Sequence, residues 1–238
     1  THLTPNIIMN MNMLEAAYEK GVEKFLFISS NTVYPFSNFA VKEEDVTNEF
    51  YESYYIVAWM KRFTEIVCEM YSGKIKSPMK TIVVRPGNLY GPYDKFDRKK
   101  SKVIPALIRR SIERQNPFIV WGDGEDNKDF LYIDDFIKGL ILAMEKINTF
   151  KPINIAYGNS IKIRDVLKHI LDASKYKDAN VKYDLKMPSM IPKRKIDISL
   201  ANELLGWKPK ISINDGIQRT VDWYKETSKR KIKNPYDY

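Results

Sequence analysis

Strand-length apolar segments alternate with amphipathic segments along the 238 residues, and this alternation restricts the possible folds more than any other feature. The segments "KFLFIS" (24–29), "KTIVVR" (80–85) and "PINIAY" (152–157) are mostly apolar, as strands buried on both faces are. Helical spacing of apolar residues separates them, and it predicts helices over 6–20, 54–72, 102–114 and 134–147. The pattern therefore predicts the α/β class, with parallel βαβ units covered by helices on both faces.

The part of the chain after residue 157 has shorter strands, more loops and more basic charge, and it is expected to form a second, smaller lobe. Helices are predicted over 161–174, with Ser160 as the N-cap, and over 199–207 and 213–229. The segment 117–135 is expected to contain two short strands around a glycine-containing turn.

Composition excludes several classes of protein. The chain is 44% hydrophobic, but no apolar run approaches the roughly 18 residues that a membrane span needs, so no membrane partner is expected. The single cysteine, Cys68, rules out an internal disulfide and fits a reducing compartment, which predicts a cytoplasmic location. With only two histidines, no metal site is expected.

The formal net charge of +9 is concentrated in a few short runs, which are "FDRKKSK", "MIPKRK" and "ETSKRKIK". One interpretation is ordinary solvated surface, and the other is a site for an anionic partner. No aromatic residues alternate with these runs, as a stacking platform for nucleic acid would need. A small molecule that carries phosphate is therefore the favoured anionic partner, and no nucleic-acid partner is expected.

Three loops follow directly after predicted parallel strands: "SSNTVYP" (29–35), "RPGNLYGP" (85–92) and "YGNS" (157–160). In open parallel sheets, ligands bind at the carboxyl ends of the strands. The three loops are therefore expected to line one crevice.

Five strings in the order of the chain resemble one family: "FISSNTVYP", "RPGNLYGPYDKFD", "SKVIPALIRR", "VWGDGEDNKDFLYIDD" and "DISLANELLGWKPKISINDGI". They resemble the extended short-chain dehydrogenase/reductase family of NAD(P)-dependent nucleotide-sugar epimerases, dehydratases and reductases, and most closely its GDP-L-fucose synthase-like members. The resemblance covers nearly the whole chain. It implies a Rossmann-type doubly wound parallel sheet with a small substrate lobe, NAD or NADP as the cofactor, a nucleotide-sugar substrate and a homodimer.

The resemblance also implies a division of the chain. Residues 1–94 and 134–157 would form the dinucleotide-binding domain, and residues 95–133 and 158–238 the substrate lobe. The family's glycine-rich G-x-x-G-x-x-G turn does not occur in these 238 residues. We therefore expect on the order of 70 residues to precede them, as two or so further βαβ units at roughly 30 residues per unit.

The family moves a hydride to or from a sugar carbon with a Ser or Thr, a Tyr and a Lys, the Tyr standing four residues before the Lys on one helix face. Ser30 corresponds to the serine and Lys61 to the lysine, which also holds the cofactor. The position of the tyrosine is Val57, which carries no proton. Tyr55 points about 200° away from Val57, whereas Tyr54 lies three residues before it on the same face and is a candidate replacement.

Fucose synthase-like members also epimerise with a Cys and a His as proton donors, and the corresponding residues here are Thr32 and Lys102. Two roles stay open for Lys102: an acid whose pKa is lowered by nearby cations, or a clamp on a phosphate or carboxylate. The altered residues argue against fucose synthase activity proper. They do not argue against binding of a nucleotide sugar.

The binding residues correspond better to the family. Pro86, Asn88 and Leu89 match the stretch beside the nicotinamide, and Asn88 also matches a substrate contact near the pyrophosphate. Trp121 and Lys128 match a nucleotide-contacting Trp and a phosphate-binding Arg. Further basic substrate contacts would be Arg110 and Arg194.

The sequence thus favours a nucleotide-sugar epimerase, dehydratase or reductase with an altered acid/base set. The alternative is a protein of the same fold that binds nucleotide sugars or partner subunits without catalysis.

Overall fold

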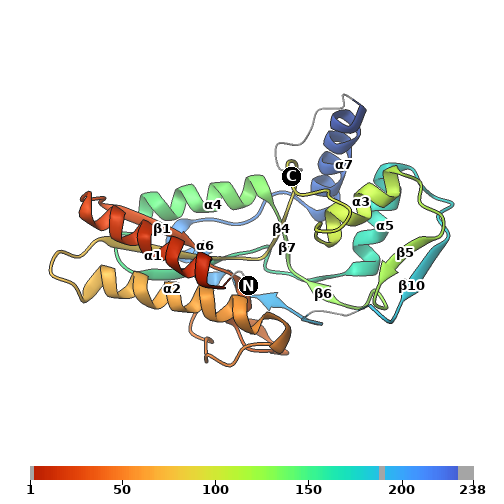
Figure 1. The fold of residues 1–238 in the computed structure, drawn as a ribbon. Coiled ribbons are helices and arrows are strands. Elements are labelled where there is room, and N and C mark those ends of the chain that lie inside the picture. The colour runs from red at the N-terminus through yellow and green to blue at the C-terminus, as the bar shows by residue number, and fades with distance from the viewer. Residues whose placement is uncertain (1–2, 188–190, 230–238) are drawn as a thin grey trace.

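The computed structural model describes residues 3–187 and 191–229. Its central sheet has three parallel strands in the order β1–β3–β8, which are β1 (Lys24–Ile28), β3 (Lys80–Pro86) and β8 (Lys151–Ile155). Helices α1 (Leu3–Glu19) and α2 (Tyr55–Gly73) cover one face, and α4 (Ile133–Lys146) and α6 (Ser199–Leu205) cover the other (Figure 1). This arrangement confirms the predicted Rossmann-type α/β fold.

Strand β3 shows why its sequence has no polar side. Ile82 and Val84 pack with Trp207 and the helices on the α4 face, while Val83 packs with Leu14 on the α1 and α2 face. All three β3 residues are completely buried, because successive side chains of a strand point to opposite faces. A strand between two helical layers therefore needs apolar side chains at nearly every position.

A second lobe lies beside the sheet and has its own hydrophobic core (Figure 1). It comprises α3 (Val103–Ile112), α5 (Ile163–Ser174), α7 (Ile213–Lys229) and the parallel pair β5 (Phe118–Trp121) and β10 (Val181–Asp184). Between the lobes, β4 (Asn88–Tyr90) pairs in parallel with β7 (Phe130–Tyr132), and β6 (Asn127–Lys128) pairs antiparallel with β9 (Ile161–Lys162). The loop after β1 contains the 3₁₀ turn η1 (Asn31–Val33), strand β2 (Ala40–Val41) paired with β11 (Lys195–Ile196), and the 3₁₀ turn η2 (Glu52–Tyr54).

Two local predictions were wrong. The N-cap of α5 is Lys162 and not Ser160, because residues 161–162 stay extended to pair with β6 before the helix begins. Segment 117–135 contains three strands rather than the two expected, and each pairs with a partner elsewhere in the chain. Gly122 and Gly124 lie between β5 and β6 with φ of 74° and 80°, which favours glycine and turns the chain toward these separate partners.

The residue bounds that the sequence assigned to the two lobes stay a prediction. Helix α6 packs against α4 and Trp207 in the core of the central sheet, although residues 158–238 were assigned to the substrate lobe. Trp207 is buried there, and its Nε1 donates to the carbonyl of Asp135 at 3.1 Å.

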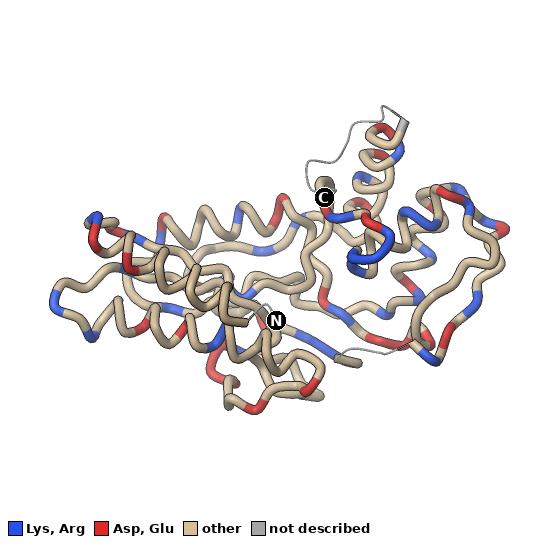
Figure 2. The backbone as a smooth tube through the Cα atoms, viewed as in Figure 1, with Lys and Arg blue, Asp and Glu red and all other residues tan. Residues whose placement is uncertain are grey.

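Basic residues are concentrated on the loop 95–102 and on the segment 193–195, while acidic and basic residues alternate over most of the remaining surface (Figure 2). In the part of the chain that the structure describes, no helix is both long and apolar enough to cross a membrane.

Candidate functional site

A cavity of about 650 Å³ lies at the carboxyl ends of β1 and β3, between the central sheet and the second lobe. Its volume falls within the roughly 300–1,000 Å³ typical of small-molecule sites. The cavity brings together every residue that the sequence singled out for the site: Ser30, Thr32, Tyr54, Val57, Lys61, Pro86, Asn88, Leu89, Lys102, Arg110, Trp121, Lys128 and Arg194. These residues are widely separated in the sequence and come from both lobes.

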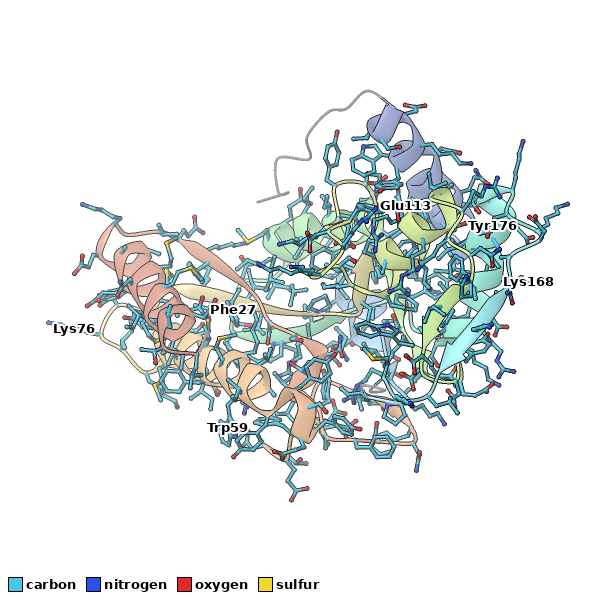
Figure 3. All side chains as sticks on the ribbon, turned by 45° about the vertical axis from the view of Figure 1, so that its right-hand side comes forward. Phe27, Trp59, Lys76, Glu113, Lys168 and Tyr176 are labelled. Carbon is cyan, nitrogen blue, oxygen red and sulfur yellow. The ribbon has the colours of Figure 1, made fainter. Side chains whose placement is uncertain are left out.

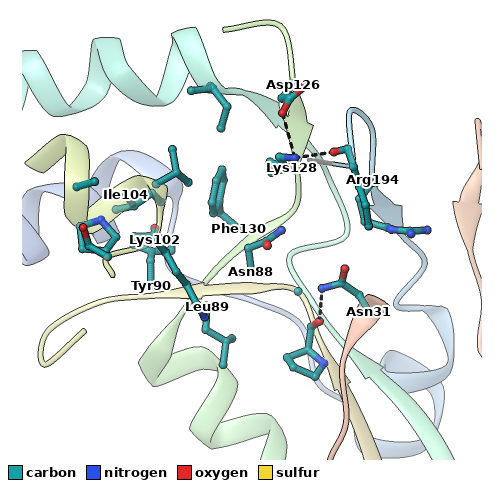
Figure 4. Close-up of a pocket in the computed structure, with 18 of the residues that line it drawn as sticks. Asn31, Asn88, Leu89, Tyr90, Lys102, Ile104, Asp126, Lys128, Phe130 and Arg194 are labelled. Carbon is teal, nitrogen blue, oxygen red and sulfur yellow. Dashed lines mark hydrogen bonds and ion pairs between the residues drawn. The ribbon is translucent and has the colours of Figure 1, made fainter. Parts of the chain in front are cut away.

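Ser30 and Thr32 form a hydroxyl pair at the end of β1. Ser30 is the N-cap of η1, and its Oγ accepts hydrogen bonds from the amide of Thr32 at 3.2 Å and from Thr32 Oγ1 at 3.0 Å. Asn31, between them, donates from Nδ2 to the carbonyl of Pro86 at 2.9 Å, which ties η1 to the end of β3 (Figure 4). The Ser30 hydroxyl proton is not used in these bonds, so Ser30 has a donor available at the cavity wall.

Lys61 reaches the same region from α2. Its Nζ donates to the carbonyl of Ile28 at 2.8 Å and lies 4.9 Å from the ring centroid of Phe27. Burial lowers the pKa of Lys61, and the nearby Glu65 carboxylate opposes this effect. Val57, one helical turn earlier, also lines the cavity, so a valine side chain stands in the position that the family resemblance gives to the acid.

The two tyrosines near the start of α2 occupy different environments. Tyr54 lines the cavity, and burial together with the Asp126 carboxylate raises its pKa. Tyr55 is exposed and forms edge-to-face contacts with Trp59 and Phe50 instead. Lys102 lies across the cavity as the exposed N-cap residue of α3. Tyr54 and Lys102 are thus in the cavity, and Tyr55 is not among the residues that line it.

The basic residues on the second-lobe side differ in how far their donors are already used. Lys128 forms an ion pair with Asp126 at 3.1 Å and donates to the carbonyl of Ile191 at 2.5 Å, and burial lowers its pKa (Figure 4). Arg194 is buried, and its Nη1 and Nη2 donate to the carbonyls of Pro35 and Tyr34 at 2.9 and 3.2 Å.

Burial lowers the pKa of Arg194 to about 10, and its Nε has no hydrogen-bond partner among the described residues. Arg110 donates from Nη1 to the carbonyl of Ile119 at 2.6 Å, and Trp121 is largely exposed at the rim. Lys102 and Trp121 therefore keep the greatest freedom to meet a ligand, whereas Arg194 is held by the backbone.

Below the cavity lies a buried polar network that the sequence analysis missed. Arg85 donates from Nε and Nη2 to the two oxygens of Glu65 at 2.9 and 2.7 Å, and Ser29 Oγ donates to Glu65 Oε1 at 2.5 Å. Arg85 Nη1 also donates to the hydroxyl of Tyr34 at 3.1 Å, and that hydroxyl donates to Asn154 Oδ1 at 2.6 Å. The network joins β1, α2, β3 and β8.

Its signals were visible in the sequence. Arg85 is a charge within the apolar run of β3, and Glu65 stands one helical turn after Lys61 on the buried side of α2. A charge at a position that should be buried indicates a partner nearby.

One of the three loops expected at the crevice is not part of the cavity wall. Loop 157–160 is not among the lining residues. The amides of Tyr157 and Gly158 instead donate to the carboxylate of Asp129 at 2.7 and 2.9 Å. This anchoring fixes the end of β8 against the β6–β7 connection, away from the cavity.

Comparison with known proteins identifies the family. Residues 2–156 match the NAD dependent epimerase/dehydratase family. The chain belongs to this family. Membership confirms the resemblance found in the sequence. The family consists of enzymes that use a nicotinamide dinucleotide as their cofactor.

The relatives and structural neighbours point the same way. The chain is 32% identical to GDP-L-fucose synthase 1 of Arabidopsis thaliana over 92% of this chain and 68% of the relative. It is 30% identical to GDP-L-fucose synthase of Escherichia coli (strain K12) over 94% of this chain and 74% of the relative. A GDP-L-fucose synthetase structure from Naegleria fowleri bound to NADP superposes with a TM-score of 0.85 at 25% identity, covering 94% of this chain and 73% of that one.

Proposed function

We propose that this protein is an NAD(P)-dependent nucleotide-sugar epimerase or reductase that works with a relocated proton donor. The substrate class rests on the relatives, which include GDP-L-fucose synthases, and on a UDP-glucose 4-epimerase of Thermotoga maritima that superposes with a TM-score of 0.81 at 27% identity, covering 94% of this chain and 70% of that one. Bound cofactor would supply hydride exchange with a sugar carbon. The remaining work of binding, orientation and proton transfer falls to the residues of the cavity.

One observation carries the proposal: the residues for hydride-transfer chemistry and those for a phosphate-bearing substrate line a single cavity. Ser30 and Lys61 lie at the sheet end, Trp121 lies on the second lobe, and Lys128 lies on β6 between the lobes. A nucleotide sugar is long enough to need both parts at once, with its sugar near Ser30 and its nucleotide near Trp121.

The residues at the sheet end fit a nicotinamide dinucleotide. Lys61 offers an ammonium group at the cavity wall, and residues 86–89 line the cavity beside it. Lys61 and the backbone beside Pro86 would hold the nicotinamide half. The G-x-x-G-x-x-G turn that binds the pyrophosphate in the family does not occur in this sequence.

Two groups are candidates for the proton donor in place of Val57. Tyr54 lines the cavity and its phenol carries a proton at neutral pH, although burial and the Asp126 carboxylate raise its pKa and make it a weaker acid than a free phenol. Lys102 enters the cavity from the opposite side, where it also attracts the Asp94 carboxylate electrostatically. Ser30 would donate its free hydroxyl hydrogen to the reacting oxygen in either case.

The competing proposal is a protein that binds nucleotide sugars without turning them over. Val57 is the observation that favours it, because loss of a general acid costs about 10²–10⁴-fold in rate. The same cavity serves both proposals, so only turnover distinguishes them.

The experiment combines binding with turnover in full-length protein. A panel of GDP-, UDP-, CDP- and dTDP-sugars is tested by thermal shift, and the best binder is assayed with NAD(P)H for wild type, Tyr54→Phe, Lys102→Ala and the matched control Tyr55→Phe. A relocated donor predicts at least a tenfold loss in kcat for Tyr54→Phe or Lys102→Ala, and no loss for Tyr55→Phe. Binding without turnover in every variant supports the non-catalytic alternative, and absence of binding to any member of the panel contradicts both.

We also propose a homodimer formed through α1 and α2. Exposed apolar side chains stand on both helices: Ile8, Met9 and Met13 on α1, and Ile56, Trp59, Phe63 and Met70 on α2. Figure 3 shows Trp59 at the outer surface of the molecule. A cytoplasmic location fits the single buried, unpaired cysteine.

A further inference from the structure

Asp129 is completely buried between two residues that line the cavity, Lys128 and Phe130. Its carboxylate accepts hydrogen bonds from the amides of Tyr157 at 2.7 Å and Gly158 at 2.9 Å, at the end of β8. No basic side chain forms an ion pair with it among the described residues. Burial of a carboxylate that only backbone amides hold costs free energy, because the charged form loses its hydration. We take its presence as a sign that it holds these chain segments in place.

The carbonyl of Asp129 contacts the cavity wall directly. The amide of Asn88 donates to it at 2.7 Å, and the side-chain Nδ2 of Asn88 donates to it at 3.0 Å. These two bonds fix both the backbone and the side-chain plane of Asn88. Figure 4 shows the Asn88 side chain among the residues that line the cavity, and its Oδ1 and second Nδ2 hydrogen are not used by these two bonds.

The fit around Asp129 leaves little room for movement. A Cβ at Gly87, the residue before Asn88, would stand 2.7 Å from Asp129 Oδ1 and 3.2 Å from its carbonyl oxygen. Asp129 is thus the point where the ends of β3, β7 and β8 are joined, one bond away from a residue that faces the ligand.

We propose that Asp129 is a positioning residue for substrate binding: its carboxylate anchors the end of β8, its carbonyl holds Asn88, and Asn88 in turn contacts the diphosphate part of a nucleotide sugar. The inference rests on the proposed function, since it assumes that this cavity binds a nucleoside diphosphate. It assigns Asp129 an effect on affinity that acts through Asn88 and not only on stability.

Asp135 provides a matched control within the same chain. It is also buried, its Oδ2 accepts the amides of Lys210 and Ile211 at 2.7 Å each, and its carbonyl accepts Trp207 Nε1 at 3.1 Å. It does not line the cavity. Asp135→Asn therefore disturbs the same kind of carboxylate anchor without touching Asn88.

The test uses full-length protein at pH 8, with GDP, UDP, CDP and dTDP as calorimetric probes and circular dichroism to measure the folded fraction. For the diphosphate that wild type binds best, Asn88→Ala and Asp129→Asn are each expected to raise Kd by about three- to tenfold, the value of one or two hydrogen bonds. The Kd of the double variant should be no higher than the higher of the two single-variant Kd values, because both changes remove the same contact. Asp135→Asn should leave Kd within about twofold while it lowers stability.

Two results would overturn the inference while leaving the proposed function intact: an unchanged Kd in Asp129→Asn, or effects that multiply in the double variant. Equal loss of affinity in Asp129→Asn and Asp135→Asn would likewise reduce Asp129 to a structural role. If wild type binds none of the four diphosphates, the proposed function fails and this inference fails with it.

Discussion

Replacement of Glu65 by Gln should destabilise the protein strongly, because it leaves the Arg85 guanidinium buried without its carboxylate. The side chains of Glu65 and Arg85 are 0% and 1% exposed, and two hydrogen bonds of 2.7 and 2.9 Å join them. Glutamine fills the same volume but turns an N–H₂ group toward Arg85 or Ser29. The perturbation therefore removes charge compensation while it preserves packing.

The magnitude follows from the burial. Removal of one partner from a buried ion pair costs about 3–5 kcal/mol, because the other charge stays desolvated. The total free energy of unfolding of a typical domain is about 5–15 kcal/mol, so this loss is a large fraction of it. The same network connects Ser29, directly before Ser30, to the helix α2 that carries Lys61, and ligand binding should therefore weaken as well.

An ion pair on the surface with the same N–O distance serves for comparison. Glu23 and Lys80 also approach to 2.7 Å, but their side chains are 76% and 39% exposed. Glu23→Gln should change stability little, because water and salt screen an exposed pair. Because the two ion pairs have the same N–O distance but differ in burial, a larger loss of stability in Glu65→Gln would come from desolvation.

Urea denaturation followed by circular dichroism measures both variants, with the free energy of unfolding from linear extrapolation. If Glu65→Gln shows no cooperative transition, its loss has exceeded the available stability. Ser29→Ala then serves as the milder test, because it removes a hydrogen bond to a charged group worth about 1.5–3 kcal/mol. A Glu65→Gln protein as stable as Glu23→Gln would show that the buried Glu65–Arg85 pair is no more important for stability than the exposed one.

Three further predictions concern the site and the surface. Val57→Tyr restores a phenol one turn before Lys61, so it should raise a slow turnover by tenfold or more if the protein is a weakened enzyme, and change little if Tyr54 or Lys102 already donates; steady-state rates with the best nucleotide sugar decide. Burial raises the pKa of Asp129 to about 7, above its unfolded value near 3.8, so the folded state holds this proton more tightly. Its contribution to stability should be greatest below pH 4 and lost as pH rises toward 7, and the stability advantage of wild type over Asp129→Asn should therefore shrink over that range; a constant difference in denaturation midpoints would contradict it. Trp59→Glu places a charge on the exposed apolar face of α2 and should convert a dimer to monomers in light scattering, whereas an unchanged mass would exclude this interface.

The main elements of the fold were predictable because their physical signals are local. The apolar runs of β1, β3 and β8 and the periodicity of α2 and α5 identify these elements from short windows of sequence. Ser160 was wrongly predicted as the N-cap of α5, because residues 161–162 pair with β6 and the helix begins only after them. Pairing between segments more than 30 residues apart leaves no trace in a local window.

The residues that line the cavity were predictable, but their hydrogen-bond partners were not. Arg194 and Lys128 were expected as ligand contacts, yet the structure uses donors of both to hold backbone carbonyls. Glu65 and Asp129 were not singled out, although Glu65 stands one helical turn after Lys61 and Asp129 directly follows Lys128. Their roles depend on partners from distant strands, and only the assembled fold brings these together.

A crystal structure of full-length protein with its best-binding nucleotide sugar and NAD(P)⁺ would show whether a nucleotide sugar spans the cavity from Trp121 to Ser30. We expect the diphosphate beside Asn88 and the basic residues near the second lobe, with the reacting sugar carbon next to the Ser30 hydroxyl and the Val57 side chain. We also expect Tyr54 or Lys102 within hydrogen-bond reach, about 2.6–3.2 Å, of the reacting oxygen. A nucleotide sugar bound outside the cavity, or a sugar that lies away from Ser30 and Lys61, would rule out this mode of binding.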